Sequence, residues 1–134
     1  MRPLFAPLLC AAALCLAAPA AAPAAELVMF ERAGCPWCEA FDREVAPIYP
    51  KTAAGKLAPL RRVDIQRPIP PDLAFLDVER ITPVFVLIDG GREIGRIRGY
   101  PGEAHFWGLF ESLVDGLPRP PPPAATENPL RRNG

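Results

Sequence analysis

The sequence predicts an α/β fold in which a four-stranded mixed sheet is flanked by helices, and three observations support this fold class. An apolar, strand-like segment at 26–31 is followed at once by helix-forming residues. A continuous apolar run at 84–88, rich in β-branched residues, is typical of a strand that is buried on both faces. The segment 103–116 carries its apolar residues at helical spacing. With the segments between them, these elements give the order βαβαββα.

The first strand and the first helix are expected before Pro47. The strand covers Glu26–Glu31, and the helix after it contains strong helix formers up to Val45. Pro47 bends or ends this helix, because proline lacks the N–H group that a helix interior needs. The polar, glycine-containing segment 51–56 is expected to be a connection to the next strand.

The second strand and the second helix are expected between residues 57 and 79. Apolar and polar residues alternate towards the end of 57–65, which favours a strand. A stiff linker with three prolines follows at 68–71. Asp72 is then a candidate cap for a short amphipathic helix over about 72–79.

The remaining elements complete the sheet and cover it. Asp89-Gly90-Gly91 is a strong hairpin signal, so the strand at 84–88 should pair antiparallel with a last strand at 92–98. Gly95 interrupts the alternation of that last strand and marks a candidate β-bulge. The closing helix is expected over 103–116.

The first 24 residues have the pattern of a secretory signal peptide. A positive start, Met1-Arg2, is followed by an apolar run over 4–18 and then by small residues that suit cleavage. Ala22-Pro23-Ala24 is the best cleavage motif, so the mature chain should begin near Ala25. An uncleaved anchor helix is the alternative, although the apolar run is short for the ~20 residues that a membrane span needs.

The last residues, 118–134, are expected to form a disordered or polyproline tail. This segment is rich in proline, which blocks both helix and sheet, and only Leu130 could anchor it. A docking role for the tail is an open alternative. What remains is one domain over 25–117.

The cysteines point to redox chemistry. Of the four cysteines, Cys10 and Cys15 lie in the predicted signal peptide, which leaves Cys35 and Cys38 as the only pair in the mature chain. Two thiols spaced CxxC at the start of a helix can shuttle between dithiol and disulfide. The pair closes too small a loop to constrain the unfolded chain much, so a working redox couple explains it better than a structural disulfide. The chain carries 15 basic and 15 acidic residues, and nothing in this balance indicates nucleic acid or an anionic membrane as a partner.

The element order resembles a minimal thioredoxin fold, because the CxxC lies at the start of the first helix and Thr82-Pro83 opens the central strand. The resemblance covers residues 26–117. It implies that Pro83 forms a cis peptide bond beside the disulfide and that Thr82 offers backbone groups to an extended substrate segment. The chain lacks the first strand and helix of full thioredoxins, as glutaredoxins do, but a glutathione site is not evident.

More narrowly, the segments 30–38 and 95–100 are similar to SoxS-type thioredoxins, small exported proteins of bacterial sulfur-oxidation (Sox) systems. This resemblance implies a periplasmic reductase for the disulfides of cysteine-containing periplasmic proteins, Sox components among them. Its electrons would come from a membrane thiol transporter. We expect a monomer that uses no cofactor and no metal.

In the expected mechanism Cys35 is the attacking thiolate, because the N-terminus of the following helix stabilises negative charge on its sulfur. Cys38 then resolves the mixed disulfide. Pro36 and Trp37 are expected to contact the partner, as are Thr82 and Pro83 on the other wall of the groove. That Trp37 instead packs on its own domain is equally open.

One position departs from the thioredoxin pattern. Thioredoxins proper carry a buried aspartate six residues before the first cysteine, where it helps to deprotonate the second, and here that position is Met29. A thioether cannot relay protons, so the resolving step needs another base. Glu31 is a candidate, and a solvated charge at the strand end is the alternative reading of this residue.

Three other functions compete with a reductase. The CxxC could serve a disulfide oxidase or isomerase, or it could hold Cu(I), a soft metal that thiolates bind. The only histidine, His105, is expected at the surface or core edge of the closing helix rather than as a ligand. A non-catalytic adaptor that uses the groove around Pro83 is the third possibility.

Overall fold

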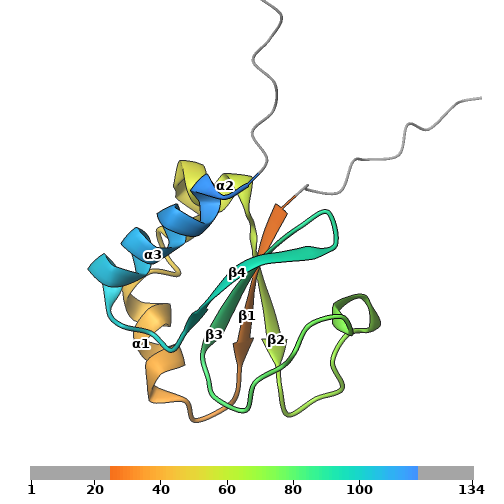
Figure 1. Ribbon diagram of the computed structural model, residues 1–134. Coiled ribbons are helices and arrows are strands. Elements are labelled where there is room, and N and C mark those ends of the chain that lie inside the picture. The colour runs from red at the N-terminus through yellow and green to blue at the C-terminus, as the bar shows by residue number, and fades with distance from the viewer. Residues whose placement is uncertain (1–24, 118–134) are drawn as a thin grey trace, which may run out of the picture.

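The computed structural model describes residues 25–117 of the 134-residue chain. The expected signal peptide, 1–24, and the expected tail, 118–134, lie outside the described residues. Figure 1 shows a sheet with all three α-helices on one side. The elements in chain order are β1 (Ala25–Glu31), α1 (Pro36–Glu44), a 3-10 turn η1 (Tyr49–Lys51), α2 (Ala53–Leu57), β2 (Leu60–Asp64), a 3-10 turn η2 (Pro71–Leu73), β3 (Val84–Asp89), β4 (Arg92–Arg98) and α3 (Glu103–Asp115).

The sheet is mixed, and its four strands lie in the order β2-β1-β3-β4. Strand β1 runs parallel to β2 and antiparallel to β3, and β3 pairs antiparallel with β4. Gly90 and Gly91 form the β3–β4 turn with positive φ angles of 55° and 72°, a conformation that glycine adopts without steric cost. The expected bulge is present, because the register of the hairpin shifts between Leu87, opposite Gly95, and Ile88, opposite Glu93. The predicted fold class is confirmed.

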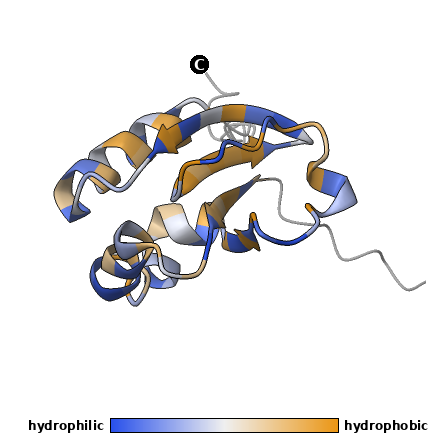
Figure 2. Ribbon diagram, turned by 90° about the horizontal axis from the view of Figure 1, so that it is seen from below, coloured by the Kyte–Doolittle hydropathy of each residue, from blue (hydrophilic) through white to orange (hydrophobic). Residues whose placement is uncertain are grey.

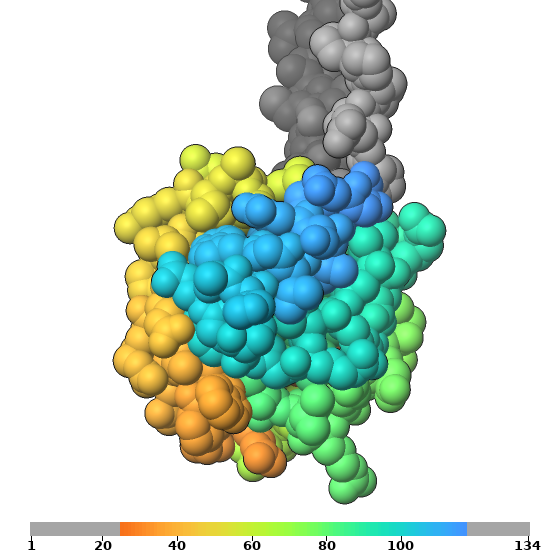
Figure 3. Space-filling view, turned by 60° about the vertical axis from the view of Figure 1, so that its left-hand side comes forward, coloured from red at the N-terminus to blue at the C-terminus, as the bar shows by residue number. Residues whose placement is uncertain are grey.

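The hydrophobic core lies on both faces of the sheet, and the two central strands are the apolar layer between its halves (Figure 2). On the helical face α1, α2 and α3 pack against side chains of β1 and β3. Phe41 of α1, Phe85 of β3 and Phe106 of α3 are in mutual ring contact at its centre. Figure 3 shows α3 lying across this face beside α1. The opposite face is covered by the irregular segment 65–83, whose Leu73 and Leu76 are buried against Val28 and Val86.

Two expectations about the connections are wrong. The segment 51–56 is not only a connection, because Thr52 caps the short helix α2 there: its hydroxyl accepts a hydrogen bond from the Gly55 N–H at 2.9 Å. The helix expected over 72–79 is reduced to the turn η2, which ends at Leu73. Asp72 does not cap it, since its carboxylate accepts hydrogen bonds from the guanidinium of Arg61 on β2, the shorter at 2.6 Å. Leu73 and Leu76 are buried on this face without a longer helix, and the partly buried Ile65, Ile69 and Val78 pack beside them.

Among residues 25–117, no helix is both long and apolar enough to cross a membrane.

Candidate active site

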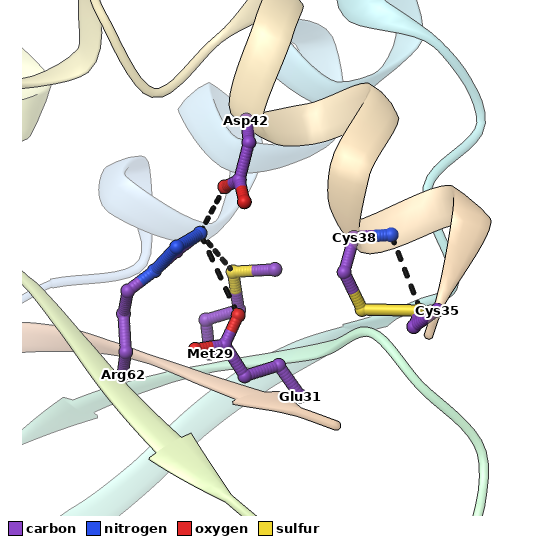
Figure 4. Close-up of a disulfide and its surroundings, with 6 residues drawn as sticks. All are labelled: Met29, Glu31, Cys35, Cys38, Asp42 and Arg62. Atoms are coloured by element: carbon purple, nitrogen blue, oxygen red, sulfur yellow. Dashed lines mark hydrogen bonds and ion pairs between the residues drawn. A yellow bond between two sulfur atoms is a disulfide. The ribbon is translucent and has the colours of Figure 1, made fainter. Parts of the chain in front are cut away.

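The CxxC motif forms the start of helix α1, and its two cysteines are joined in a disulfide (Figure 4). Cys35 is the N-cap residue with an extended backbone, and its sulfur accepts a hydrogen bond from the Cys38 N–H at 3.2 Å. Pro36 occupies the first helical position, where a missing N–H costs nothing. Gly34, with φ of 69°, makes the turn out of β1 that brings Cys35 to the helix end. The local sequence therefore places a sulfur at the positive end of the helix dipole.

The four residues of the motif differ sharply in exposure. Cys35 and Cys38 are only 3% and 4% exposed, whereas Trp37 is 60% exposed and Pro36 is also on the surface. The indole therefore does not pack into its own domain. It stands beside the disulfide as an apolar surface that a second molecule can cover.

The loop before β3 forms the second wall of the site. The peptide bond between Thr82 and Pro83 is cis, as the sequence resemblance implied. Val84, the next residue, pairs with Phe30 near the end of β1. The antiparallel register therefore brings Pro83 to the same end of the two central strands as the CxxC. Figure 3 shows α1 and the segment before β3 side by side at the lower end of the molecule.

Thr82 has unused hydrogen-bonding groups. Its Oγ1 is buried without a partner in the described structure, and neither its N–H nor its carbonyl bonds to another backbone group of residues 25–117. The neighbouring Pro83 carbonyl, by contrast, accepts a hydrogen bond from the Gly99 N–H at 2.8 Å. The backbone N–H and carbonyl of Thr82 are therefore the groups to which an extended segment of another chain could add hydrogen bonds.

Comparison with solved structures agrees with this geometry. The periplasmic thioredoxin SoxS from Paracoccus pantotrophus, in its reduced form, is 42% identical to this chain, with a TM-score of 0.65, and the match covers 69% of this chain and 97% of that one. This chain belongs to the thioredoxin-like superfamily. It resembles SoxS within that superfamily, and its CxxC disulfide supports the general activity of a thiol–disulfide oxidoreductase.

A second thioredoxin-like structure shares the fold alone. Thioredoxin from Malassezia sympodialis is 19% identical, with a TM-score of 0.51, and the match covers 67% of this chain and 75% of that one. No protein-family model matches the sequence, and a search of curated proteins found no match.

Next to the disulfide, this thioredoxin-like protein has an arginine-centred cluster that sequence reasoning missed. Met29 is fully buried, and the parallel register sets Arg62 of β2 directly beside it, with its Nη2 3.6 Å from the thioether sulfur. The same guanidinium forms ion pairs with Asp42 of α1 and with Glu31 at the end of β1, the latter at 3.6 Å. Figure 4 shows the Met29 thioether between Arg62 and the disulfide.

Glu31 and Asp42 are the two carboxylates of this cluster that could accept a proton, and Glu31 is the one that the sequence singles out. Burial raises the pKa of Glu31 above its ordinary value, and the nearby Arg62 opposes that rise. Its side chain keeps about a quarter of its surface exposed, so solvent reaches it. A signal for Arg62 existed in the sequence, namely a charged residue in the strand expected to follow the CxxC helix, but only the register shows that it faces Met29.

The other expected features can also be placed. His105 is exposed on α3. Within 25–117, no three His, Cys, Asp or Glu side chains gather closely enough to hold a metal ion.

Proposed function

We propose that this protein is a periplasmic protein-disulfide reductase that acts through Cys35 and Cys38 on cysteine-containing partners of a sulfur-oxidation (Sox) system. The observation that carries the proposal is the 42% identity to a periplasmic thioredoxin named SoxS over 97% of its length, with a CxxC disulfide at the start of α1 and a cis-Pro83 loop beside it. The expected signal peptide, 1–24, supports export to the periplasm.

The reaction transfers two electrons from the dithiol to the partner. The Cys35 thiolate attacks one sulfur of the partner disulfide, whose S–S bond breaks, and the departing partner thiolate takes up a proton. Cys38 then loses its proton and attacks the Cys35 sulfur, which breaks the mixed disulfide and releases the second partner thiolate. The protein is left as the disulfide seen in the structure. A membrane thiol transporter would return the two electrons, since the periplasm is kept oxidising.

The site suits a protein partner better than a small disulfide. Trp37 offers an exposed apolar surface on one side of the sulfurs, and Thr82 offers unpaired backbone groups on the other. An extended segment lying between these walls would present its disulfide to Cys35.

The partner can be identified by trapping. The Cys38→Ser variant, expressed in the source cells, should accumulate a mixed disulfide between Cys35 and its partner, because no second thiol resolves it. Mass spectrometry should identify an exported, cysteine-containing protein, and reduction should release it. The Cys35→Ser variant is the matched control and should trap nothing. Equal capture by both variants, or no capture by Cys38→Ser, would contradict the proposal.

The direction of transfer is tested separately by the reduction potential. A reductase should have a potential near that of thioredoxin, about −270 mV, whereas a strong disulfide oxidase lies near about −120 mV. A value at the oxidising end would replace the reductase with the oxidase or isomerase.

A further inference from the structure

An open hollow of about 410 Å³ lies beside the site, on the face of the sheet opposite the helices. Its lining comes from three segments that are distant in sequence: Arg32 follows β1, Ile65 and Gln66 follow β2, and Val78, Glu79 and Arg80 precede β3. Ile65 and Val78 pack against the core on that face and form the apolar part of the wall.

The hollow is close to both walls of the active site. Arg32 is three residues before Cys35, and Arg80 is three residues before Pro83. Three residues of extended chain span at most about 11 Å, so each arginine lies within that distance of its side of the site. A partner segment bound between Cys35 and Pro83 would therefore pass the hollow within a few of its own residues.

The charge of the hollow is unbalanced. Its one acidic lining residue, Glu79, is already held by Arg96 at 2.7 Å and by Arg98 at 2.8 Å. These two guanidiniums lower the pKa of Glu79, so it stays ionised and paired. Arg32 and Arg80 are exposed and form no ion pair with any residue of the described domain. The hollow thus presents two free guanidiniums.

We propose that this hollow binds an acidic stretch of the partner protein, next to the cysteine that the partner presents to Cys35. The proposal rests on the reductase function above and adds a rule for partner selection. Guanidinium groups bind carboxylates through paired, charge-assisted hydrogen bonds. The apolar wall of Ile65 and Val78 accommodates the methylene groups of a glutamate, and Gln66 adds an amide. Because an extended chain advances about 3.3 Å per residue, the acidic residues should lie about three or four positions from the partner's cysteine.

The test uses symmetrical disulfides of short peptides, in which attack on either sulfur is equivalent. Each peptide carries one cysteine with two glutamates three and four residues away on each side. Matched versions carry glutamine or lysine at the same positions. Reduction by the pre-reduced, mature protein is followed by chromatography of acid-quenched samples, at low and at high salt.

We expect the second-order rate constant of this single-turnover reaction to follow the order acidic, neutral, basic, with about a fivefold preference for acidic over neutral, as two exposed ion pairs would give. The Arg32→Gln/Arg80→Gln double variant should lose this preference while still reducing the neutral peptide at the wild-type rate. Arg92→Gln is the control: it removes the same charge from an exposed position on the β3–β4 hairpin, at the other end of the sheet. Arg92→Gln should therefore keep the preference for the acidic peptide. In the wild-type protein, added salt should weaken this preference, because salt screens exposed charges.

The outcomes separate the two proposals. If the protein reduces all three peptides equally, or if the double variant keeps the acidic preference, the hollow is not the acidic subsite and the reductase function stands. Oxidised glutathione is assayed in the same way. If the double variant reduces it more slowly but reduces the acidic peptide at the wild-type rate, the hollow binds a small disulfide and this proposal is overturned. If no peptide is reduced at all, the reductase function fails and this proposal with it.

Discussion

Trp37 gives the sharpest prediction about how the protein meets its partner. Its side chain is 60% exposed beside the disulfide, so Trp37→Ala removes a contact surface without opening a cavity in the core. The free energy of unfolding should change little, because substitutions at exposed positions usually alter it by less than about 0.5 kcal/mol. The cost should appear when a partner is bound.

The magnitude follows from the exposed area. A tryptophan presents up to about 250 Å², so about 150 Å² of Trp37 is open to a partner at an exposed fraction of 60%. If the partner covers half of this, burial at about 25 cal/mol per Å² contributes about 2 kcal/mol. We therefore expect kcat/KM for a protein disulfide to fall about 25-fold in Trp37→Ala.

The assay compares a protein disulfide, such as those of insulin, with an aliphatic disulfide of a few atoms that is too small to cover the indole. Trp37→Ala should slow the first reaction and leave the second nearly unchanged. Leu57→Ala is the control, because Leu57 is 53% exposed but ends α2, just before the start of β2 and at the opposite edge of the sheet from the disulfide. It should slow neither reaction.

Two results would refute this reasoning. Unchanged reduction of the protein disulfide by Trp37→Ala would mean that the exposed indole is not a contact surface. An equal loss with the small disulfide would mean that Trp37 acts on the chemistry of the sulfurs instead.

Three further predictions concern the proton acceptor and the fold. Glu31→Gln should slow the resolving step by about 100-fold, and the wild-type rate of that step should fall as pH drops through the raised pKa of Glu31, because a base must be ionised to accept a proton. Rapid-quench measurement of the release of a trapped partner gives both rates. An identical pH profile in the variant would mean that Glu31 is only a solvated charge at the strand end. Tyr49→Phe should lower the free energy of unfolding by about 1–2 kcal/mol, and Tm by several degrees, because the buried hydroxyl donates to the Ala58 carbonyl at 2.6 Å; an unchanged urea midpoint would contradict this. Gly108→Ala should raise the free energy of unfolding by about 0.5–1 kcal/mol, since the added Cβ on α3 meets nothing within 4 Å. Gly55→Ala should be severely destabilising, because its Cβ would collide with the Tyr49 carbonyl. Calorimetry that finds Gly55→Ala more stable than Gly108→Ala would refute the reasoning.

The strands and two of the helices could be predicted because their signals are local. The apolar run at 84–88 and the glycines after it specify a buried strand and a hairpin whatever the rest of the chain does. The CxxC cap of α1 and the spacing of α3 are equally local. The segment 72–79 differs from its prediction because its apolar spacing also fits a helix, whereas in the structure only one 3-10 turn forms and Leu73 and Leu76 are buried from an otherwise irregular segment.

The residues of the candidate site also differ in how far the sequence alone predicts them. Cys35, Cys38 and Pro83 could be proposed from motif spacing and family resemblance, because redox cysteines and the proline loop keep a recognisable sequence pattern. The exposure of Trp37 could not, since one indole suits a core and a surface equally well. The ion pair between Glu31 and Arg62 could not be predicted from the sequence either, because the two residues are 31 positions apart.

By itself, the sequence determined the class of fold and the chemistry of this protein, since an apolar run or a pair of closely spaced thiols can be recognised from a few adjacent positions. The tertiary structure decided which charges surround that chemistry. Parallel pairing of β1 with β2 brings Arg62 to Met29, and the loops at one sheet edge bring Arg32 to the same hollow as Arg80. Such neighbours depend on strand register and on how loops cross a sheet edge, and both are fixed only when the whole core packs.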